Sequence, residues 1–264
     1  MFNNTLAVIR QYLSSSVGDL IEGTFDSGTT TTGVHTLLRK ADDYYNEHKY
    51  RAYIYGGTDI GEEREIDDWV KSTNTLTFDP AFSSAIDVTS SYELHRIFFA
   101  DELKKAINLA IATLADKYFI DKTDVTTVLV ADVYEYTLPD GIGYVTRITT
   151  EETADEGIFE ESDVIDTRNW RLISPRKLKL HEDYYSVSAG KDLRIEGQGR
   201  QSLLSADTDI CYLPPDWIVQ KAITMLPWNK IQSNQLDGVY NRAWALSARE
   251  PRNNPHPFAR KVVE

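Results

Sequence analysis

Residues 213–223 read Leu-Pro-Pro-Asp-Trp-Ile-Val-Gln-Lys-Ala-Ile, and a second stretch of helical character follows at 236–249. Pro215 and Asp216 suit the first turn of a helix, because the amide that proline lacks has no helical partner there. Apolar residues then recur at intervals of three and four until Pro227 ends the pattern. The two predicted helices complete a hydrophobic pattern that begins far upstream.

The clearest helical pattern lies at 100–118. Its apolar positions follow the helical template almost without a break: Leu103, Ala106, Ile107, Ala110, Ile111, Leu114 and Tyr118. Asp101 and Glu102 lie in the first turn and Lys117 in the last, as the helix dipole prefers. A further apolar stripe at 4–21 predicts an N-terminal helix. No one of these helices buries its stripe alone, so we expect them to pack as one small bundle.

Two long stretches between the helices have the alternation of β-strands. In 23–96 the strand-forming runs end at turn signals such as Gly56-Gly57, and in 123–213 at Leu138-Pro139-Asp140-Gly141. The sequence therefore predicts an α+β fold in which a small helical bundle is interrupted by two antiparallel β insertions. The expected parts are a bundle core at 1–22, 97–122 and 214–249, β insertions at 23–96 and 123–213, and an extended C-terminal arm at 250–264.

Composition places the chain among soluble proteins of a reducing compartment. Its 264 residues are 41% hydrophobic, which is enough for a substantial core, and no stretch has the length of apolar sequence that a membrane helix needs. The single cysteine, Cys211, excludes an internal disulfide framework. The net charge of −13 argues against a surface that grips nucleic acid. It is compatible with DNA that passes an acidic wall without sticking.

The usual signatures of catalysis and metal binding are missing from the sequence. The five histidines include no pair at helical i, i+4 spacing, and the acidic run at 151–166 lacks the ligand pattern of a calcium loop. Gly197-x-Gly199 follows a strand but no helix start follows it, so it indicates a turn rather than a phosphate loop. We therefore expect no enzyme, no metal and no cofactor.

The C-terminal segment differs from the rest of the chain. It combines basic and apolar side chains in an acidic protein: Arg249, Arg252, Phe258, Arg260, Lys261, Val262 and Val263. One interpretation is a floppy terminus. The other is an arm that becomes ordered on a partner, with its apolar side chains as anchors and its basic ones meeting carboxylates.

At this point the chain resembles the head-to-tail adaptor, or connector, proteins of tailed bacteriophages. The features that carry the resemblance are the run 102–118, Tyr136-Thr137-Leu138-Pro139, Leu213-Pro214-x-x-Trp217, and the last helix leading into a tail. In addition, 53–58, with Ser72-Thr73 and 78–80, resembles a β module of phage neck proteins.

The resemblance implies a structural protein of the virion neck, assembled in the cytoplasm of the bacterial host. It implies a ring, commonly of twelve copies, that docks under the portal and surrounds the DNA channel. Its partners would be further copies of itself, the portal protein, a downstream tail or stopper protein, and double-stranded DNA that passes without specific binding; no membrane is involved. The arm at 249–264 would dock to the portal. The helices would supply subunit packing through Leu103, Ile107, Ala110, Ile111, Leu114, Trp217, Tyr240 and Trp244.

Other functions remain open at the level of sequence. A tail-tube or stopper component would differ in whether it purifies with tails or with the portal. A carbohydrate-binding β module of a tail tip would stack Trp69 or Trp170 on a sugar. An enzyme acting on the cell wall has no positive support.

Overall fold

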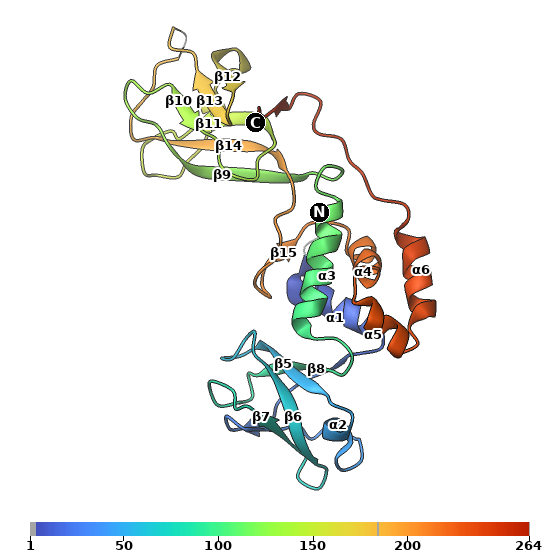
Figure 1. Cartoon of the computed structure of the whole chain (residues 1–264). Helices are drawn as coiled ribbons and strands as arrows, with labels where there is room; N and C mark the ends of the chain where they lie inside the picture. The colour runs from blue at the N-terminus through green and yellow to red at the C-terminus, as the bar shows by residue number, and fades with distance from the viewer. Residues whose placement is uncertain (1–3, 184, 264) are drawn as a thin grey trace. The chain divides into compact units, whose positions relative to one another are not determined.

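The computed structural model describes residues 4–183 and 185–263, and the chain divides into two compact units (Figure 1). Unit 1 extends to Thr113 and resumes over Leu203–Glu250. Unit 2 covers Leu114–Ser202 and resumes at Pro251. Each unit therefore contains a segment from the C-terminal part of the chain.

The larger sheet of unit 1 is antiparallel and has seven strands. Their spatial order is β2 (Ile21–Thr24), β8 (Ser91–His95), β5 (Arg51–Gly56), β6 (Glu63–Val70), β7 (Thr75–Asp79), β4 (Thr32–Val34) and β3 (Ser27–Gly28). Burial alternates along β5 and β7, as expected for strands with one face on a core. The short helix α2 (Tyr44–Glu47) packs against β6, and Trp69 is completely buried in this core. Gly33 allows the close packing, since a Cβ there would lie 2.5 Å from the ring of Phe25.

The remaining helices of unit 1 pack against one another. They are α1 (Leu6–Ser16), α3 (Ala100–Thr113), α4 (Pro215–Ile223), α5 (Trp228–Ser233) and α6 (Asp237–Ser247). α3 and α1 both contact α4, and α4 contacts α6. The hydroxyl of Thr5 accepts a hydrogen bond from the amide of Val8 at 3.4 Å and so caps α1. Just before α1, β1 (Asn4–Thr5) pairs with β15 (Ile210–Cys211), which joins the start of the chain to the segment leading into α4.

Unit 2 consists of two antiparallel sheets. One has the order β16 (Arg260–Lys261), β11 (Tyr144–Thr150), β14 (Asp192–Gly199) and β9 (Ile120–Val128), and the other β10 (Glu135–Thr137), β13 (Lys177–Leu180) and β12 (Trp170–Ile173). Two short 3-10 helices, Glu161–Asp163 and Thr167–Asn169, lie between β11 and β12. Buried residues of both sheets form one hydrophobic core, which includes Ile148, Trp170 and Leu178. Val262, next to the C-terminal strand, belongs to the same core and is only 3% exposed.

The predicted fold class is wrong. Within the described residues, sixteen strands form four sheets, and the six α-helices have only 4 to 14 residues each. Two hydrophobic cores are built on sheets, so the β-regions are not insertions into a helical bundle. The helical periodicity was a strong signal for each short helix, but it did not show how much more of the chain is strand. The protein is a β-rich chain.

The central helix is also shorter than its apolar pattern predicts. α3 ends at Thr113, and the amides of Lys117 and Tyr118 both bond to the carbonyl of Leu114 at 3.0 Å, within a turn that precedes β9. The hydroxyl of Thr113 donates to the carbonyl of Ala110 at 2.7 Å, a local bond that competes with continuation of the helix. The apolar pattern continues past the helix because Leu114, in the turn, is itself buried.

Candidate interaction site

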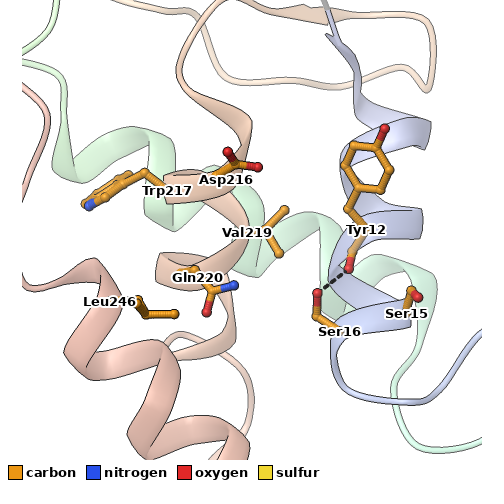
Figure 2. A pocket seen from close by; sticks show the side chains of 8 residues that line it. All are labelled: Tyr12, Ser15, Ser16, Asp216, Trp217, Val219, Gln220 and Leu246. Atoms are coloured by element: carbon orange, nitrogen blue, oxygen red, sulfur yellow. Dashed lines mark hydrogen bonds between the residues drawn. The ribbon is translucent and has the colours of Figure 1, made fainter.

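An open groove lies on the helical side of unit 1 (Figure 2). α1 lines it with Tyr12, Ser15 and Ser16, α4 with Asp216, Trp217, Val219 and Gln220, and α6 with Leu246. Its volume is about 630 Å³, which is within the range of clefts that hold a side chain or a short peptide segment. The groove forms where α1 and α6, which are distant in sequence, both pack against α4.

Two polar side chains along the groove form hydrogen bonds within the chain. The hydroxyl of Ser16 donates to the carbonyl of Tyr12 at 2.7 Å, shown as a dashed line in Figure 2. The indole Nε1 of Trp217 donates to the carbonyl of Ser247 at 3.2 Å and fixes α4 to α6. Val219 points from α4 toward Tyr12, so the floor between α4 and α1 is apolar. The groove is therefore fixed in shape and suited to apolar contact.

Large apolar side chains around the groove are exposed to solvent. Tyr12 is 53% exposed, Leu246 54%, and Trp244, on the same helix as Leu246, 63%. Scattered exposed apolar residues are normal, but a hollow with aromatic and aliphatic rims is typical of a protein-binding surface. Tyr and Trp in particular give large buried areas at little cost in side-chain entropy. The arrangement can bind an apolar segment of a protein.

A separate cluster of polar side chains lies between α1 and the seven-stranded sheet. The guanidinium of Arg10 donates to both oxygens of Glu93, at 2.7 and 2.9 Å, and to both of Asp207, at 2.5 and 3.1 Å. Tyr53 places its ring 4.2 Å from the guanidinium carbon and donates its hydroxyl to Asp207 at 2.9 Å. His95 lies 3.0 Å from Glu93 through Nε2. All five are brought together from α1, β5, β8 and the segment before β15.

The interactions within this cluster favour the ionised forms of Arg10 and Glu93. Burial alone disfavours the charge on Arg10, but the bonds and charges of Glu93 and Asp207 outweigh it and raise the pKa of Arg10. Burial likewise opposes the ionisation of Glu93, yet hydrogen bonds from His95 and Arg10 bring the pKa of Glu93 below its ordinary value. Burial raises the pKa of Tyr53. Because the donors of Arg10 are used within the chain, the cluster is a structural tie between helices and sheet rather than a reactive site.

The sequence-predicted packing residues fall into two groups. Leu103, Ile107, Ala110 and Ile111 are buried in unit 1, and Leu114 is buried at the start of unit 2, so each already has its partners within one chain. Trp217 is mostly buried against α6. Tyr240 is half-buried and packs edge-on against Trp228. Only Trp244 of this set presents its ring to solvent.

The residues of the expected arm are also divided. Arg249 is exposed at the end of unit 1, whereas Arg252 and its successors belong to unit 2. The guanidinium of Arg260 lies 4.3 Å from the ring of Trp170 and donates to its carbonyl at 2.5 Å, and Lys261 pairs with Tyr144 in the sheet. Val262 is buried, while Phe258 is 83% exposed and Val263 is 45% exposed. Two residues of the predicted arm, Arg260 and Lys261, thus form a strand of a β-sheet, and Val262 belongs to its core.

Sequence reasoning missed the groove-lining Tyr12, Val219 and Leu246. Tyr12 lies outside the apolar stripe of 4–21, and Leu246 lies outside the stripe of 236–249. Their positions off the buried stripes are the signal that could have identified the groove. Large apolar side chains on the polar face of an amphipathic helix indicate a second contact surface. Val219 carried no such signal because it adjoins the buried Ile218.

The two tryptophans considered for sugar stacking have no exposed face. Trp69 is 0% and Trp170 is 1% exposed. A sugar-binding platform needs an open ring, so neither residue can serve the carbohydrate-binding alternative in this structure.

Among residues 4–183 and 185–263, no group of three or more His, Cys, Asp or Glu side chains is placed to hold a metal ion. In that same part of the chain, no helix combines the length and the apolar character needed to cross a lipid bilayer. No protein-family model matches the chain, and no curated protein matches it either.

Proposed function

We propose that the chain is a structural head-to-tail adaptor of a tailed bacteriophage. In this role copies of the chain form a ring under the portal, with twelve copies as the number that the family resemblance implies. The ring continues the DNA channel and connects the capsid to the tail. The proposal starts from the sequence resemblance at 102–118, 136–139 and 213–217.

The observation that carries the proposal is the apolar groove of α1, α4 and α6. A ring subunit must offer its neighbours apolar surface that remains exposed when the chain is alone. Tyr12 and Leu246 provide such surface at a hollow, and Trp244 is a further exposed ring on α6. This supports an assembly role for the helical face, with contacts made by exposed side chains rather than by the buried stripe.

The charge of the chain supports the same role. A net charge of −13 repels a passing polyanion and prevents it from sticking to the wall of a channel. An adaptor needs DNA to move past without specific binding, and an acidic chain provides this by long-range repulsion.

The groove is tested by Leu246→Glu, with Leu37→Glu as the matched control. Both leucines are exposed in unit 1, at 54% and 67%, but only Leu246 lines the groove. We expect Leu246→Glu to weaken assembly by tenfold or more, because it places a charge in an apolar contact, while Leu37→Glu assembles like the wild type. Assembly is measured by electron microscopy and sedimentation of the chain co-expressed with the portal protein of its phage.

Three outcomes of that experiment decide the proposal. Rings or portal-bound particles that disappear with Leu246→Glu support it. A chain that stays monomeric and never binds the portal overturns it. Purification with tails and not with the portal would instead identify a tail-tube or stopper component.

A further inference from the structure

A second cavity, of about 600 Å³, lies in unit 2 beside the C-terminal strand. Phe119, Ile142 and Val262 give it an apolar floor. Three of its lining residues are basic, Arg176, Arg200 and Lys261, and one, Asp116, is acidic. In a chain of net charge −13, this is a local reversal of sign.

The cations around the cavity are unequally compensated. Arg200 forms an ion pair with Asp116 at 2.5 Å. Lys261 is exposed, and no ion pair to it is found among the described residues. Lys122 adjoins the cavity behind Gly141 and Gly199, and in the described part of the chain its ammonium donates a hydrogen bond only to the hydroxyl of Ser202, at 3.5 Å. The cavity therefore presents positive charge that the chain itself does not neutralise.

Lys122 is half-buried beside the cavity. Burial lowers the pKa of Lys122, and within the described residues no carboxylate offsets this effect. Its ammonium lies against the backbone at Gly141, where an added Cβ would be 2.7 Å from Nζ. A half-buried lysine held in this way gains stability when an anion binds beside it.

The complementary surface is the acidic loop 152–160 of the same unit. Its acidic side chains are exposed, and no ion pair to them is found in the described part of the chain: Glu152, Asp155, Glu156 and Glu160. Ile158 lies among them and is 44% exposed. An apolar side chain flanked in sequence by carboxylates matches an apolar floor with an excess of basic side chains in its lining.

The loop is held in shape rather than floppy. The buried carboxylate of Glu151 accepts hydrogen bonds from the amides of Gly157 and, at 3.1 Å, of Asp155 and Asp192. These bonds lower the pKa of Glu151, so it stays ionised and continues to anchor the loop at neutral pH. A preformed loop binds with a smaller entropic penalty than a disordered one.

The loop and the cavity lie at opposite ends of one strand. Tyr144, the first residue of β11, lines the cavity, and the loop follows Thr150, the last residue of β11. Six residue steps of a strand span about 20 Å, so the loop cannot reach the cavity of its own chain. Complementary patches on opposite ends of a subunit make head-to-tail contacts, which close into rings or continue as filaments.

We propose that loop 152–160 of one copy binds the basic cavity of the next copy. Ile158 enters the apolar floor, and the carboxylates around it pair with Lys261 and Lys122. This inference rests on the proposed ring and names one of its contacts. The salt bridges at the rim are exposed, so we expect the contact to weaken as salt rises.

The test is a charge exchange with two single variants, Lys261→Glu and Glu156→Lys. Each alone gives like charges at the contact, so we expect self-association to weaken by tenfold or more in sedimentation velocity. An equimolar mixture restores association, because each cavity then meets a loop of opposite charge in an alternating order. Lys71→Glu, an exposed lysine of unit 1, is the control and associates like the wild type.

The outcomes separate this contact from the adaptor role. Loss in both single variants with recovery in the mixture supports the contact. Normal association of either variant, or a wild-type chain that stays monomeric, overturns it, whereas portal binding by the same samples leaves the adaptor role standing. If Lys261→Glu reduces binding to a short DNA duplex while leaving self-association intact, the cavity serves a nucleic-acid phosphate and the loop contact is wrong.

Discussion

Arg10 of unit 1 and Lys122 of unit 2 show two ways in which a chain places a cation away from water. Arg10 is 1% exposed and meets two carboxylates in a forked geometry. Lys122 is only half-buried, and among the described residues only the hydroxyl of Ser202 approaches its ammonium. The charge of Arg10 is neutralised within one chain, whereas the charge of Lys122 would be neutralised by an anion bound from outside.

The difference separates structural charge from binding charge. Burying a cation requires compensation of its lost hydration, and the chain supplies this for Arg10 with Glu93 and Asp207. For Lys122 the uncompensated cost is smaller because water still reaches it. A cation left in that state is therefore a better indicator of a binding site than one with a strongly raised pKa.

The largest effect is expected from Arg10→Ala. Removing the guanidinium leaves the carboxylates of Glu93 and Asp207 buried and unpaired, so we expect unit 1 to lose about 3–5 kcal/mol of unfolding free energy. The control is Lys105→Ala, which breaks an exposed pair with Asp101 in the same unit and should leave the stability nearly unchanged, because solvent screens that pair. Hydrogen exchange of the amides in α1 and β8 reports unit 1 separately. Equal protection in the two variants would show that Arg10 is not the tie between helices and sheet.

A smaller effect is expected at the C-terminal strand, where two adjacent valines differ in burial. Val262 is 3% exposed in the core of unit 2, and Val263 is 45% exposed. We expect Val262→Ala to destabilise unit 2 by about 1–3 kcal/mol and Val263→Ala by less than about 0.5 kcal/mol. Urea denaturation, with exchange of the β11 amides as the local probe, measures both. If the two substitutions have the same small effect, the tail is not part of the core and remains available as a free arm.

Acid should act on unit 1 through Glu93. Its folded pKa lies below the ordinary value of 4.5, because hydrogen bonds from His95 and Arg10 outweigh burial. The resulting stabilisation is fully present above about pH 4.5 and is lost as the pH falls through the folded pKa. Glu93→Gln should remove part of this pH dependence when unit 1 unfolding is followed between pH 7 and 3. A wild-type profile that stays flat over this range would contradict the assignment.

The sequence was informative about local elements and poor at their assembly. The helices at 6–16, 100–113, 215–223 and 237–247 follow from apolar periodicity and proline positions. That pattern is local, whereas the Arg10–Glu93 and Arg10–Asp207 pairs join residues 83 and 197 positions apart. The spacing from Leu6 and Leu13 places Arg10 on the apolar side of its helix, but nothing near it in sequence identifies the carboxylates that it meets. For the same reason the apolar periodicity of the helices identifies their buried residues and does not identify the exposed Tyr12 and Leu246 as a contact surface.

The smallest effect is expected from Lys122→Met, and it sharpens the contrast with Arg10. Methionine keeps the length of the side chain but removes a charge that is half-buried without a carboxylate. We expect unit 2 to be stabilised by less than about 1 kcal/mol, since solvent screening limits the cost that is relieved. Self-association should weaken at the same time, because the cavity loses a cation that meets loop 152–160. Lys179→Met is the control, since the ammonium of Lys179 pairs with Glu135 at 3.0 Å and belongs neither to the cavity lining nor to loop 152–160. A gain in stability combined with a loss in self-association would show that Lys122 contributes to binding between copies and not to the stability of unit 2. A loss in both would mean that Lys122, like Arg10, serves the fold alone.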